Sequence, residues 1–419
     1  MAHLLYVCLD GLGDDPLEEL DGRTPLEAAE TPALDGLAAR GRSGTVVTVG
    51  PDVAPESDIA VFAILGYDPT EEHPGRGVVE AIGVDLPFTT GDLAYRVNFA
   101  TAAWPDIIDR RVGRDLRSEE AAALADEVNR ELRLPDATFE LRATVEHRGV
   151  LVIRSAEGSL SANVSNTDPA YRKEGSLGVA LERFEPRVAS CVPLDATREA
   201  RRSADLTNAF VEGAARILDA SEVNRRRRAA GSMPGNVILT RDAGDTRPTL
   251  QPIRERFGLA WGCFVEMPVE RGIARVLGMD EVDVPRLATA SDYAVWAERA
   301  AEAVGEYEAV YVHLKGPDVP AHDGRGADKR DVISLIDRAF FSEVLPRLDP
   351  RGTVVAVTAD HSTSCARKAH TADPVPLVVA GAGVPPDGCE GFGERAAASG
   401  ALGRLRGVDI LPGVVPLLA

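Results

Sequence analysis

Several features that mark other protein classes are scarce or missing in this sequence of 419 residues. Its five cysteines are odd in number and form no Cys-x-x-Cys pair, which disfavours a disulfide framework and favours the reducing cytoplasm. No apolar run approaches the roughly 18 residues of a membrane helix, so we expect no membrane partner. The first residues lack a basic segment and their apolar run stops at Asp10, which disfavours a signal peptide.

Positive charge is also in short supply. Lys and Arg total 46 against 66 Asp and Glu, a formal charge of −20, which disfavours nucleic acid as a partner. A local cluster of arginines or a metal can still bind a small anion. Hydrophobic residues make up 44% of the chain, as in a globular protein, and the length predicts two or three domains.

Both ends of the chain alternate strand and helix patterns. Apolar runs predict strands, and segments with helical spacing predict helices, the first of them with Gly41 at its carboxyl-terminal cap. Continuous apolar strands separated by helices are typical of an α/β core with a mostly parallel sheet flanked by helices. The strands are expected at 3–9, 44–49, 308–314, 353–359 and 376–380, and the helices at 24–40 and 328–347.

The middle of the chain has a different pattern. Strands are expected at 93–99 and 147–154 and a helix at 118–132, and the α/β pattern resumes at 236–240. We therefore expect a smaller α+β domain, residues 86–235, inserted into a discontinuous core domain made of residues 1–85 and 236–419.

Acidic residues follow three of the predicted core strands. Asp10, Asp318 and Asp360 come at or shortly after the strand ends, and histidines lie near the last two, at His322, His361 and His370. The carboxyl ends of parallel strands share one edge, where ligands bind. Mixed Asp and His ligands suit Zn²⁺ or Mn²⁺, and six are enough for two ions. A single Asp after a strand is more often a turn residue or a helix cap, and it is the combination of three such acids with three nearby histidines that indicates a metal site.

Ser57 precedes an apolar helical stretch, residues 59–65. One interpretation is a helix N-cap. The other is a nucleophile, because free N–H groups and the positive end of a helix dipole at that position favour a phosphoryl group. A serine hydroxyl needs activation by a base or a metal.

These residues lie in a series of motifs that span nearly the whole chain. The sequence resembles the archaeal type of cofactor-independent (2,3-bisphosphoglycerate-independent) phosphoglycerate mutases of the alkaline phosphatase superfamily. The motifs that carry the resemblance are CLDGLGD, TPLEAAETPALDGLAARG, PESDIAVFAILGYDP, GRGVVEAIGVDL, YRVNFAT, DRRVGR, HRGVLVIR, SNTDP, HLKGPDVPAHDGRGADKRDVISLIDR and TADHSTSCARKAHTADPVPLVVAG.

The resemblance implies an alkaline-phosphatase-like core with two divalent ions, typically Mn²⁺, with Mg²⁺, Co²⁺ or Zn²⁺ in relatives, and no 2,3-bisphosphoglycerate. One ion would be held by Asp10, Ser57, Asp360 and His361, and the other by Asp318, His322 and His370. Ser57 would take the phosphoryl group of 3-phosphoglycerate and return it to the 2-hydroxyl of glycerate. This reaction belongs to glycolysis and gluconeogenesis.

The resemblance also implies that the inserted domain is a lid that excludes water and binds the small phosphorylated acid. Arg pairs suit carboxylates and phosphates, although any one Arg can equally be a surface charge. Lys315 stands out because only four lysines are present and it lies at a strand end beside the expected ligands. The cation candidates in the lid are Arg110, Arg111, His147, Arg228 and Arg241. A monomer or a small homo-oligomer is expected.

Three segments depart from the family pattern. Residues 241–244 read Arg-Asp-Ala-Gly where Arg-Gly-Ala-Gly is expected, and residues 221–224 read Ser-Glu-Val-Asn instead of His-Pro-Val-Asn. Residues 287–294 replace a Gly-Ala-Thr-Gly segment and an Asp-Thr pair. Asp242 would repel an anionic substrate if it faced the pocket. The alternative function is therefore a related phosphotransferase or phosphohydrolase that acts on a different small phosphorylated acid.

Overall fold

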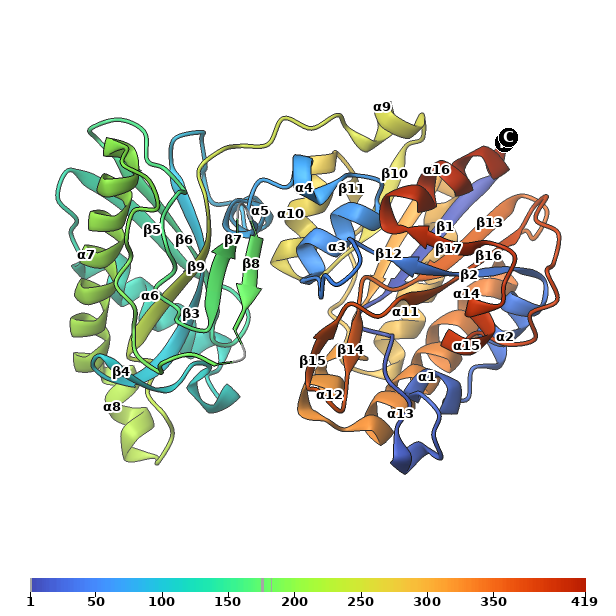
Figure 1. The fold of residues 1–419 in the computed structure, drawn as a ribbon, viewed down its shortest axis with the longest axis horizontal. Coiled ribbons are helices and arrows are strands. Elements are labelled where there is room, and N and C mark those ends of the chain that lie inside the picture. The colour runs from blue at the N-terminus through green and yellow to red at the C-terminus, as the bar shows by residue number, and fades with distance from the viewer. Residues whose placement is uncertain (1, 175–176, 182) are drawn as a thin grey trace. The chain divides into compact units, whose positions relative to one another are not determined.

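The computed structural model describes residues 2–174, 177–181 and 183–419 (Figure 1). The chain divides into two compact units. The first unit is Met1–Glu72 with Leu250–Ala419, and the second unit is His73–Thr249. The sequence analysis placed the two boundaries at residues 86 and 235, and both positions lie within the second unit.

An eight-stranded sheet forms the centre of the first unit, in the order β11-β10-β12-β1-β13-β16-β2-β17. The strands from β11 to β13 run parallel, β16 is antiparallel to both neighbours, and β17 is parallel to β2. The predicted mostly parallel α/β core is confirmed. The strands are β1 His3–Leu9, β2 Gly41–Val47, β10 Trp261–Phe264, β11 Asp280–Glu281, β12 Ala309–Leu314, β13 Thr353–Thr358, β16 Val375–Gly381 and β17 Gly403–Arg406, with a separate hairpin of β14 Ser362–Ser364 and β15 Ala369–Thr371.

Helices flank this sheet, and several pack directly on it. Helix α11 contacts β1 and β12, and α2 contacts β2 and β16. The helices of the first unit are α1 Pro25–Ala28, α2 Pro32–Ala39, α3 Ser57–Ile64, α4 Pro69–Glu72, α9 Ile253–Phe257, α10 Pro268–Leu277, α11 Ala290–Glu306, α12 Asp318–Asp323, α13 Gly326–Ile336, α14 Ser342–Val344, α15 Glu394–Ala398 and α16 Ile410–Val414.

The helix predicted over 24–40 is in fact two helices. Pro32 has no N–H to continue α1, so the chain leaves the helix at Ala29 and begins α2 at Pro32. The backbone N–H groups of Ala33 and Leu34 donate to the Asp337 carboxylate at 3.1 and 2.9 Å and so cap the new helix. The expected cap at Gly41 was wrong, because Gly41 is the first residue of β2.

A five-stranded sheet organises the second unit. Its order is β4-β3-β6-β5, and β9 also pairs with β3, on the edge opposite β6. The segment 236–240, expected to return to the core, lies in β9 and pairs with β3 of the second unit. The strands and helices are β3 Leu93–Ala103, β4 Asp106–Asp109, β5 Ala137–Ala143, β6 Arg148–Ser155, β9 Val237–Gly244, the hairpin β7 Tyr171–Glu174 and β8 Leu177–Ala180, α5 Arg76–Gly83, α6 Ser118–Glu131, α7 Arg198–Ala220 and α8 Glu222–Ala229.

The side chains of β3 alternate between two apolar cores, as the twofold period of a strand requires. Tyr95, Val97 and Phe99 pack in a core that includes residues of α6 and α7, whereas Ala94 packs with Val78 of α5. The sheet of the second unit is therefore covered by helices on both faces, and α5 belongs to this unit because it packs on β3 and β9.

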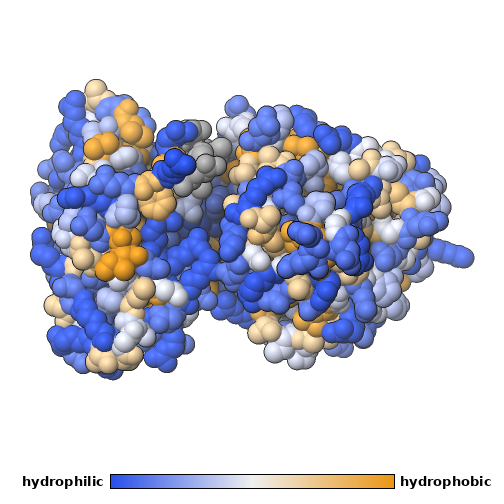
Figure 2. Space-filling model, turned by 60° about the horizontal axis from the view of Figure 1, so that its bottom comes forward, coloured by the Kyte–Doolittle hydropathy of each residue, from blue (hydrophilic) through white to orange (hydrophobic). Residues whose placement is uncertain are grey.

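Polar residues dominate the face that is drawn in Figure 2. Figure 2 shows a mostly hydrophilic face with small apolar patches, consistent with the charged residues that make up 27% of the chain. Among the residues that the structure describes, no helix combines the length and the apolar character needed to cross a membrane.

Candidate active site

The carboxyl ends of three adjacent parallel strands gather the acidic residues of the first unit. Strand β1 lies between β12 and β13. Asp10 directly follows β1, Lys315 directly follows β12, and Asp360 comes two residues after β13. The structure therefore brings these residues to one sheet edge, where the sequence analysis expected them.

His361 is the centre of the first group. Its Nε2 lies 3.3 Å from Asp360 Oδ2, 3.6 Å from Asp10 Oδ1 and 3.1 Å from Ser57 Oγ. Ser57 is the first residue of α3, whose N-cap residue is Glu56. The hydroxyl of Ser57 thus points to this cluster of side chains, which is the arrangement that the nucleophile interpretation requires.

The second group surrounds Asp318, the first residue of α12. Its Oδ1 is 3.5 Å from Nε2 of both His322 and His370, and those two nitrogens are 3.2 Å apart. The rings of His361 and His370 stack with centroids 3.8 Å apart, which joins the two groups. All seven residues predicted as metal ligands therefore lie together in the first unit.

Hydrogen bonds at Nδ1 orient all three imidazoles. Nδ1 of His322 and of His370 lie 3.1 and 2.7 Å from the carbonyl oxygens of Lys368 and Pro55, which can only accept. Both rings therefore carry a proton on Nδ1, and Nε2 of each ring faces the site. Carbonyl partners at the outer nitrogen are typical of metal-ligating histidines.

The same arrangement holds at His361. The hydroxyl of Thr363 donates to Asp318 Oδ1 at 2.8 Å, so its oxygen is left to accept from His361 Nδ1 at 3.0 Å. The backbone N–H of Gly11 donates to Asp360 Oδ1 at 3.0 Å. A Cβ at Gly11 would lie 2.8 Å from the Asp318 side chain, so only glycine lets the chain pass between the two acids.

The negative charge of the site is incompletely balanced. Asp10 Oδ1 and Asp360 Oδ2 are buried and accept no hydrogen bond from any residue that the structure describes. Burial and the charge of Asp10 raise the pKa of Asp360 well above its usual range. Although burial opposes it, the contact with Asp318 raises the pKa of His370 to about 10.

The ligand atoms fit metal ions. Two sets, Asp10 with Asp360 and His361, and Asp318 with His361 and His370, each have ligand atoms within 4.8 Å of one another. Carboxylate oxygens and imidazole nitrogens are ligands for Mn²⁺ and Zn²⁺. The site can therefore hold divalent cations, which would satisfy the orphaned carboxylate oxygens.

Lys315 is the main positive charge beside these acids. Its Nζ lies 3.1 Å from Asp10 Oδ2 and 2.7 Å from Glu270 Oε1. Glu270 was missed in the sequence analysis. Its position three residues into the Met267-Pro268 helix start predicts an ordinary helix cap, and it does accept the Met267 N–H at 3.1 Å.

The second unit contains a cluster of arginines. Arg110 makes two hydrogen bonds to the buried Asp168 carboxylate, at 2.8 and 2.6 Å. The guanidinium groups of Arg110 and Arg241 both lie over the ring of Tyr171, 5.1 and 3.8 Å from its centroid. Planar, oriented guanidinium groups of this kind suit carboxylates and phosphates.

His147 is buried near further arginines. Burial and the charges of Arg148 and Arg111 lower the pKa of His147 to about 3. Arg96 and Arg114 contribute to the same shift, and neither they nor Arg148 was named in the sequence analysis. Two features of the sequence could have indicated Arg114 and Arg148: Arg114 follows Arg111 by three residues, and Arg148 is next to His147.

Arg228 is in a different place. It lies on α8, partly exposed, where it pairs with Asp219. Among the described residues, no recorded contact joins it to Arg110, Arg111 or Arg241.

The departure at Asp242 has a structural cause. Two residues of β9, Asp242 and Ala243, oppose Tyr95 of β3, which makes a bulge, and Asp242 has φ of 57°. Glycine is favoured in this left-handed region, and Asp tolerates it. The Asp242 carboxylate is buried 3.1 Å from Arg241 Nη1, so its charge is offset by that guanidinium.

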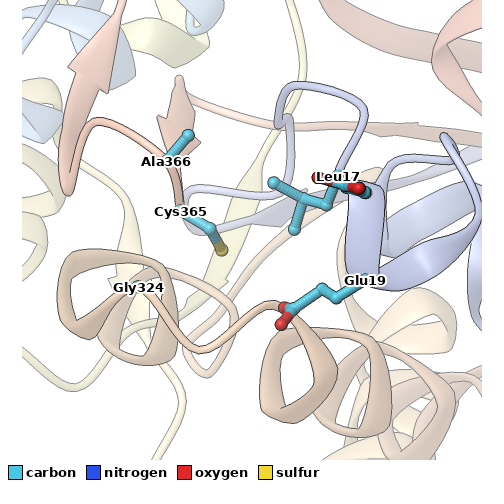
Figure 3. Close-up of a pocket in the computed structure, with 6 residues that line it drawn as sticks. Leu17, Glu19, Gly324, Cys365 and Ala366 are labelled. Carbon is cyan, nitrogen blue, oxygen red and sulfur yellow. The ribbon is translucent and has the colours of Figure 1, made fainter.

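A separate cavity of about 480 Å³ lies in the first unit (Figure 3). It is lined by Leu17, Glu18, Glu19, Gly324, Cys365 and Ala366, none of them a predicted site residue. Burial and hydrogen bonding with Asp14 raise the pKa of the Cys365 thiol to about 12, so that thiol stays protonated.

Comparison with known proteins points in one direction. The family model for 2,3-bisphosphoglycerate-independent phosphoglycerate mutase matches residues 38–224. Curated proteins of that name are 43% identical in Aeropyrum pernix, over 99% of both chains, and 38% identical in Methanopyrus kandleri, over 97% of this chain and 94% of the other.

Solved structures agree. A protein of Pyrococcus horikoshii is 32% identical with a TM-score of 0.81, covering 100% of this chain and 97% of the other. The cofactor-independent phosphoglycerate mutase of Thermoplasma acidophilum is 33% identical with a TM-score of 0.64, and the two chains cover each other over 100% of their lengths.

Proposed function

Because this chain belongs to the 2,3-bisphosphoglycerate-independent phosphoglycerate mutases, we propose that it interconverts 3-phosphoglycerate and 2-phosphoglycerate through a phosphoserine at Ser57. The observation that carries the proposal is the position of Ser57 Oγ, 3.1 Å from His361 Nε2 in a cluster of acids and imidazoles at the sheet edge. The substrate is a small phosphorylated acid and the enzyme works in the cytoplasm as a monomer or a small homo-oligomer.

Two divalent cations complete the site in this proposal. One is held by Asp10, Ser57, Asp360 and His361 and the other by Asp318, His322 and His370. Mn²⁺ is the proposed ion, with Mg²⁺, Co²⁺ or Zn²⁺ as alternatives. When bound, the cations neutralise phosphoryl oxygens and favour the alkoxide of the serine.

The side chains of the protein prepare the nucleophile. His361 Nδ1–H donates to Thr363, which leaves Nε2 of the ring facing Ser57 Oγ at 3.1 Å and available to the same cation. Ser57 Oγ loses its proton and attacks phosphorus, the bond from phosphorus to the 3-oxygen breaks, and that oxygen takes up a proton and leaves as the 3-hydroxyl of glycerate. The ammonium of Lys315 stabilises the negative charge of the transferring group.

The second half of the reaction reverses the first at a different oxygen. Glycerate turns within the site, its 2-hydroxyl loses its proton and attacks phosphorus, and the bond to Ser57 Oγ breaks as that oxygen takes up a proton. This exchange requires that glycerate stays bound and that water stays away from the phosphoserine.

We assign this retention to the second unit, as a substrate-binding lid. Arg110, Arg111, His147 and Arg241 bind the carboxylate and phosphate of the substrate, because their guanidinium and imidazole groups lie in one polar cluster of that unit. Arg228 is left out of the proposal because of its position on α8 and its pairing with Asp219.

A coupled assay tests this function. Purified protein with Mn²⁺ receives 3-phosphoglycerate without 2,3-bisphosphoglycerate, and both 2-phosphoglycerate and free phosphate are followed. We expect 2-phosphoglycerate at enzymatic rates, loss of activity with excess chelator, recovery with Mn²⁺, and loss of activity in Ser57→Ala. Free phosphate as the sole product would indicate a phosphohydrolase. Neither product, from folded and metal-loaded protein, would indicate a phosphotransferase with a different substrate.

A further inference from the structure

Lys315 is held at its ammonium by an acid on another helix. Glu270, in the first turn of α10, lies 2.7 Å from Lys315 Nζ, whereas Asp10 Oδ2 lies 3.1 Å from the same nitrogen. The Lys315 side chain is 20% exposed and that of Glu270 only 1%. The Lys315 side chain therefore keeps some exposure to solvent, while the carboxylate that pairs with it is fully buried.

The carboxylate of Glu270 is itself fixed. Its Oε2 accepts the Met267 backbone N–H at 3.1 Å, so the side chain is bound to its own helix start and has little freedom. His313 lies 3.8 Å away, but burial and Lys315 lower its pKa to about 3 and leave it uncharged. Among the residues that the structure describes, Lys315 is therefore the one charged partner recorded for Glu270.

The backbone of Lys315 is held as well. The hydroxyl of Tyr293, on α11, donates to the Lys315 carbonyl oxygen at 2.6 Å. The next residue, Gly316, has φ of 144°, and a Cβ there would lie 3.0 Å from Tyr293 Oη and 2.7 Å from Val332 Cγ1. Tyr293 belongs to segment 287–294, which departs from the family pattern.

A buried carboxylate is costly unless it is paired, and replacing such a pair by apolar residues is often neutral or stabilising. Stability alone therefore gives little reason to keep Glu270. The position of Glu270 beside Lys315 does give a reason. An unrestrained lysine side chain samples many rotamers and would lose that freedom each time it binds the phosphoryl group, whereas a lysine held by Glu270 is already ordered.

We propose that Glu270 and Tyr293 are positioning residues that fix Lys315 for phosphoryl transfer, Glu270 through the ammonium and Tyr293 through the carbonyl oxygen. This inference rests on the proposed function of the site. Lys315 touches the reacting group, and the other two act through it.

The test is a cycle of variants measured for kcat and KM with 3-phosphoglycerate, starting from wild-type protein that forms 2-phosphoglycerate. Glu270→Gln keeps the size of the side chain and removes its charge. We expect kcat to fall roughly tenfold to a hundredfold, with KM within about threefold, because the lost interaction acts in the transition state. In a Lys315→Met background the same change should have no further effect on kcat.

Tyr293→Phe is a milder variant that removes one hydroxyl, and we expect a fall in kcat of roughly threefold to tenfold. Tyr67→Phe is its matched control, because Tyr67 is equally buried and donates to the Gln251 carbonyl at 2.7 Å. Glu27→Gln is the control for Glu270, since Glu27 likewise accepts the backbone N–H of its own helix-cap residue, Thr24, at 3.2 Å but pairs with Arg395. Both controls should keep the wild-type kcat.

Three outcomes overturn the inference. They are a wild-type kcat in Glu270→Gln, an undiminished effect of that change in the Lys315→Met background, or equal losses in Tyr293→Phe and Tyr67→Phe. If Glu270→Gln does not fold, the kcat of Tyr293→Phe relative to its control decides the question. A wild-type protein that forms no 2-phosphoglycerate would instead refute the proposed function, so the two failures are distinguishable.

Discussion

The two units concentrate opposite charges. In the first unit, three aspartates and three histidines surround Ser57 at the sheet edge, and burial raises the pKa of Asp360. In the second unit, arginines surround His147, and burial with their charges lowers its pKa to about 3. The first cluster is therefore suited to cations and the second to anions.

The largest effect is expected from a change in the cation-binding cluster of the first unit. Asp360→Asn keeps the shape of the side chain but removes a ligand charge, and we expect the mutase rate to fall on the order of a thousandfold or more. The bound Mn²⁺, counted by equilibrium dialysis, should fall from two ions to one. Asp331→Asn, an exposed aspartate of α13 paired with Arg330, is the control. Two bound ions and normal turnover in Asp360→Asn would refute the ligand assignment.

Substitutions of two arginines test anion binding by the second unit. Arg111→Met removes a charge from the arginine cluster, and we expect KM to rise roughly tenfold to a hundredfold with kcat little changed, as for the loss of a charged hydrogen bond in uniform binding. Arg228→Met should leave both constants within about twofold, because its pair with Asp219 is a surface ion pair. Steady-state kinetics with 3-phosphoglycerate measure both. An equal KM for the two variants would remove Arg111 from the binding site.

The sequence predicted the first cluster better than the second. Asp10, Asp318 and Asp360 were found because parallel strands bring their carboxyl ends to one edge, so chain position alone implies proximity. The arginine cluster depends on side chains from β3, β6 and β9 and on an antiparallel sheet whose strand order the sequence does not reveal. Arg228 was named from the Arg-rich run that ends at that residue, whereas Arg96, which contributes to the pKa shift of His147, was not named.

The sequence also did not reveal the residues that contact Lys315. Glu270 has the pattern of a helix cap and Tyr293 that of an apolar helix face, because their partner Lys315 lies 45 and 22 residues away in the chain. The break between α1 and α2 was missed because the apolar spacing of 24–40 continues across Pro32. The unit boundaries differ because β9 pairs with β3, a contact that periodicity cannot show.

A third prediction concerns the pH dependence of folding stability, which Glu394 in the first unit should affect. Burial raises the pKa of Glu394, in the first unit, to about 7, against the hydrogen bond from Thr24. The folded protein then holds a proton that the unfolded chain loses near pH 4.5, so this contribution to stability is full below pH 4.5 and is lost as pH rises to 7. The shift corresponds to about 3 kcal/mol.

Glu394→Gln should remove this dependence. Urea unfolding at pH 5 and pH 8 measures it, and wild type should lose more stability between the two values than the variant does. Glu343→Gln, which changes an exposed glutamate paired with Arg347, is the control and should follow wild type. Parallel pH profiles for wild type and Glu394→Gln would contradict the shift. His147 in the second unit has the opposite sign, since its lowered pKa makes stability fall as pH falls.

The smallest expected effect concerns Asp242, an acid that pairs with Arg241 in the second unit. Asp242 offsets the charge of Arg241 from a bulge where its φ is 57°. Asp242→Gly restores the family residue without strain, and Arg241 keeps its position over Tyr171. We expect KM for 3-phosphoglycerate to fall roughly twofold to fivefold, because an anion then meets a less neutralised guanidinium.

Asp242→Asn separates charge from backbone conformation, because it retains a side chain in the bulge and removes the negative charge. If charge is the cause, Asn and Gly should lower KM equally. A lower KM in the Gly variant alone would assign the effect to the backbone at the bulge. A higher KM in both would mean that Asp242 orients Arg241 for the substrate, and the carboxylate would then belong to the binding site instead of opposing it.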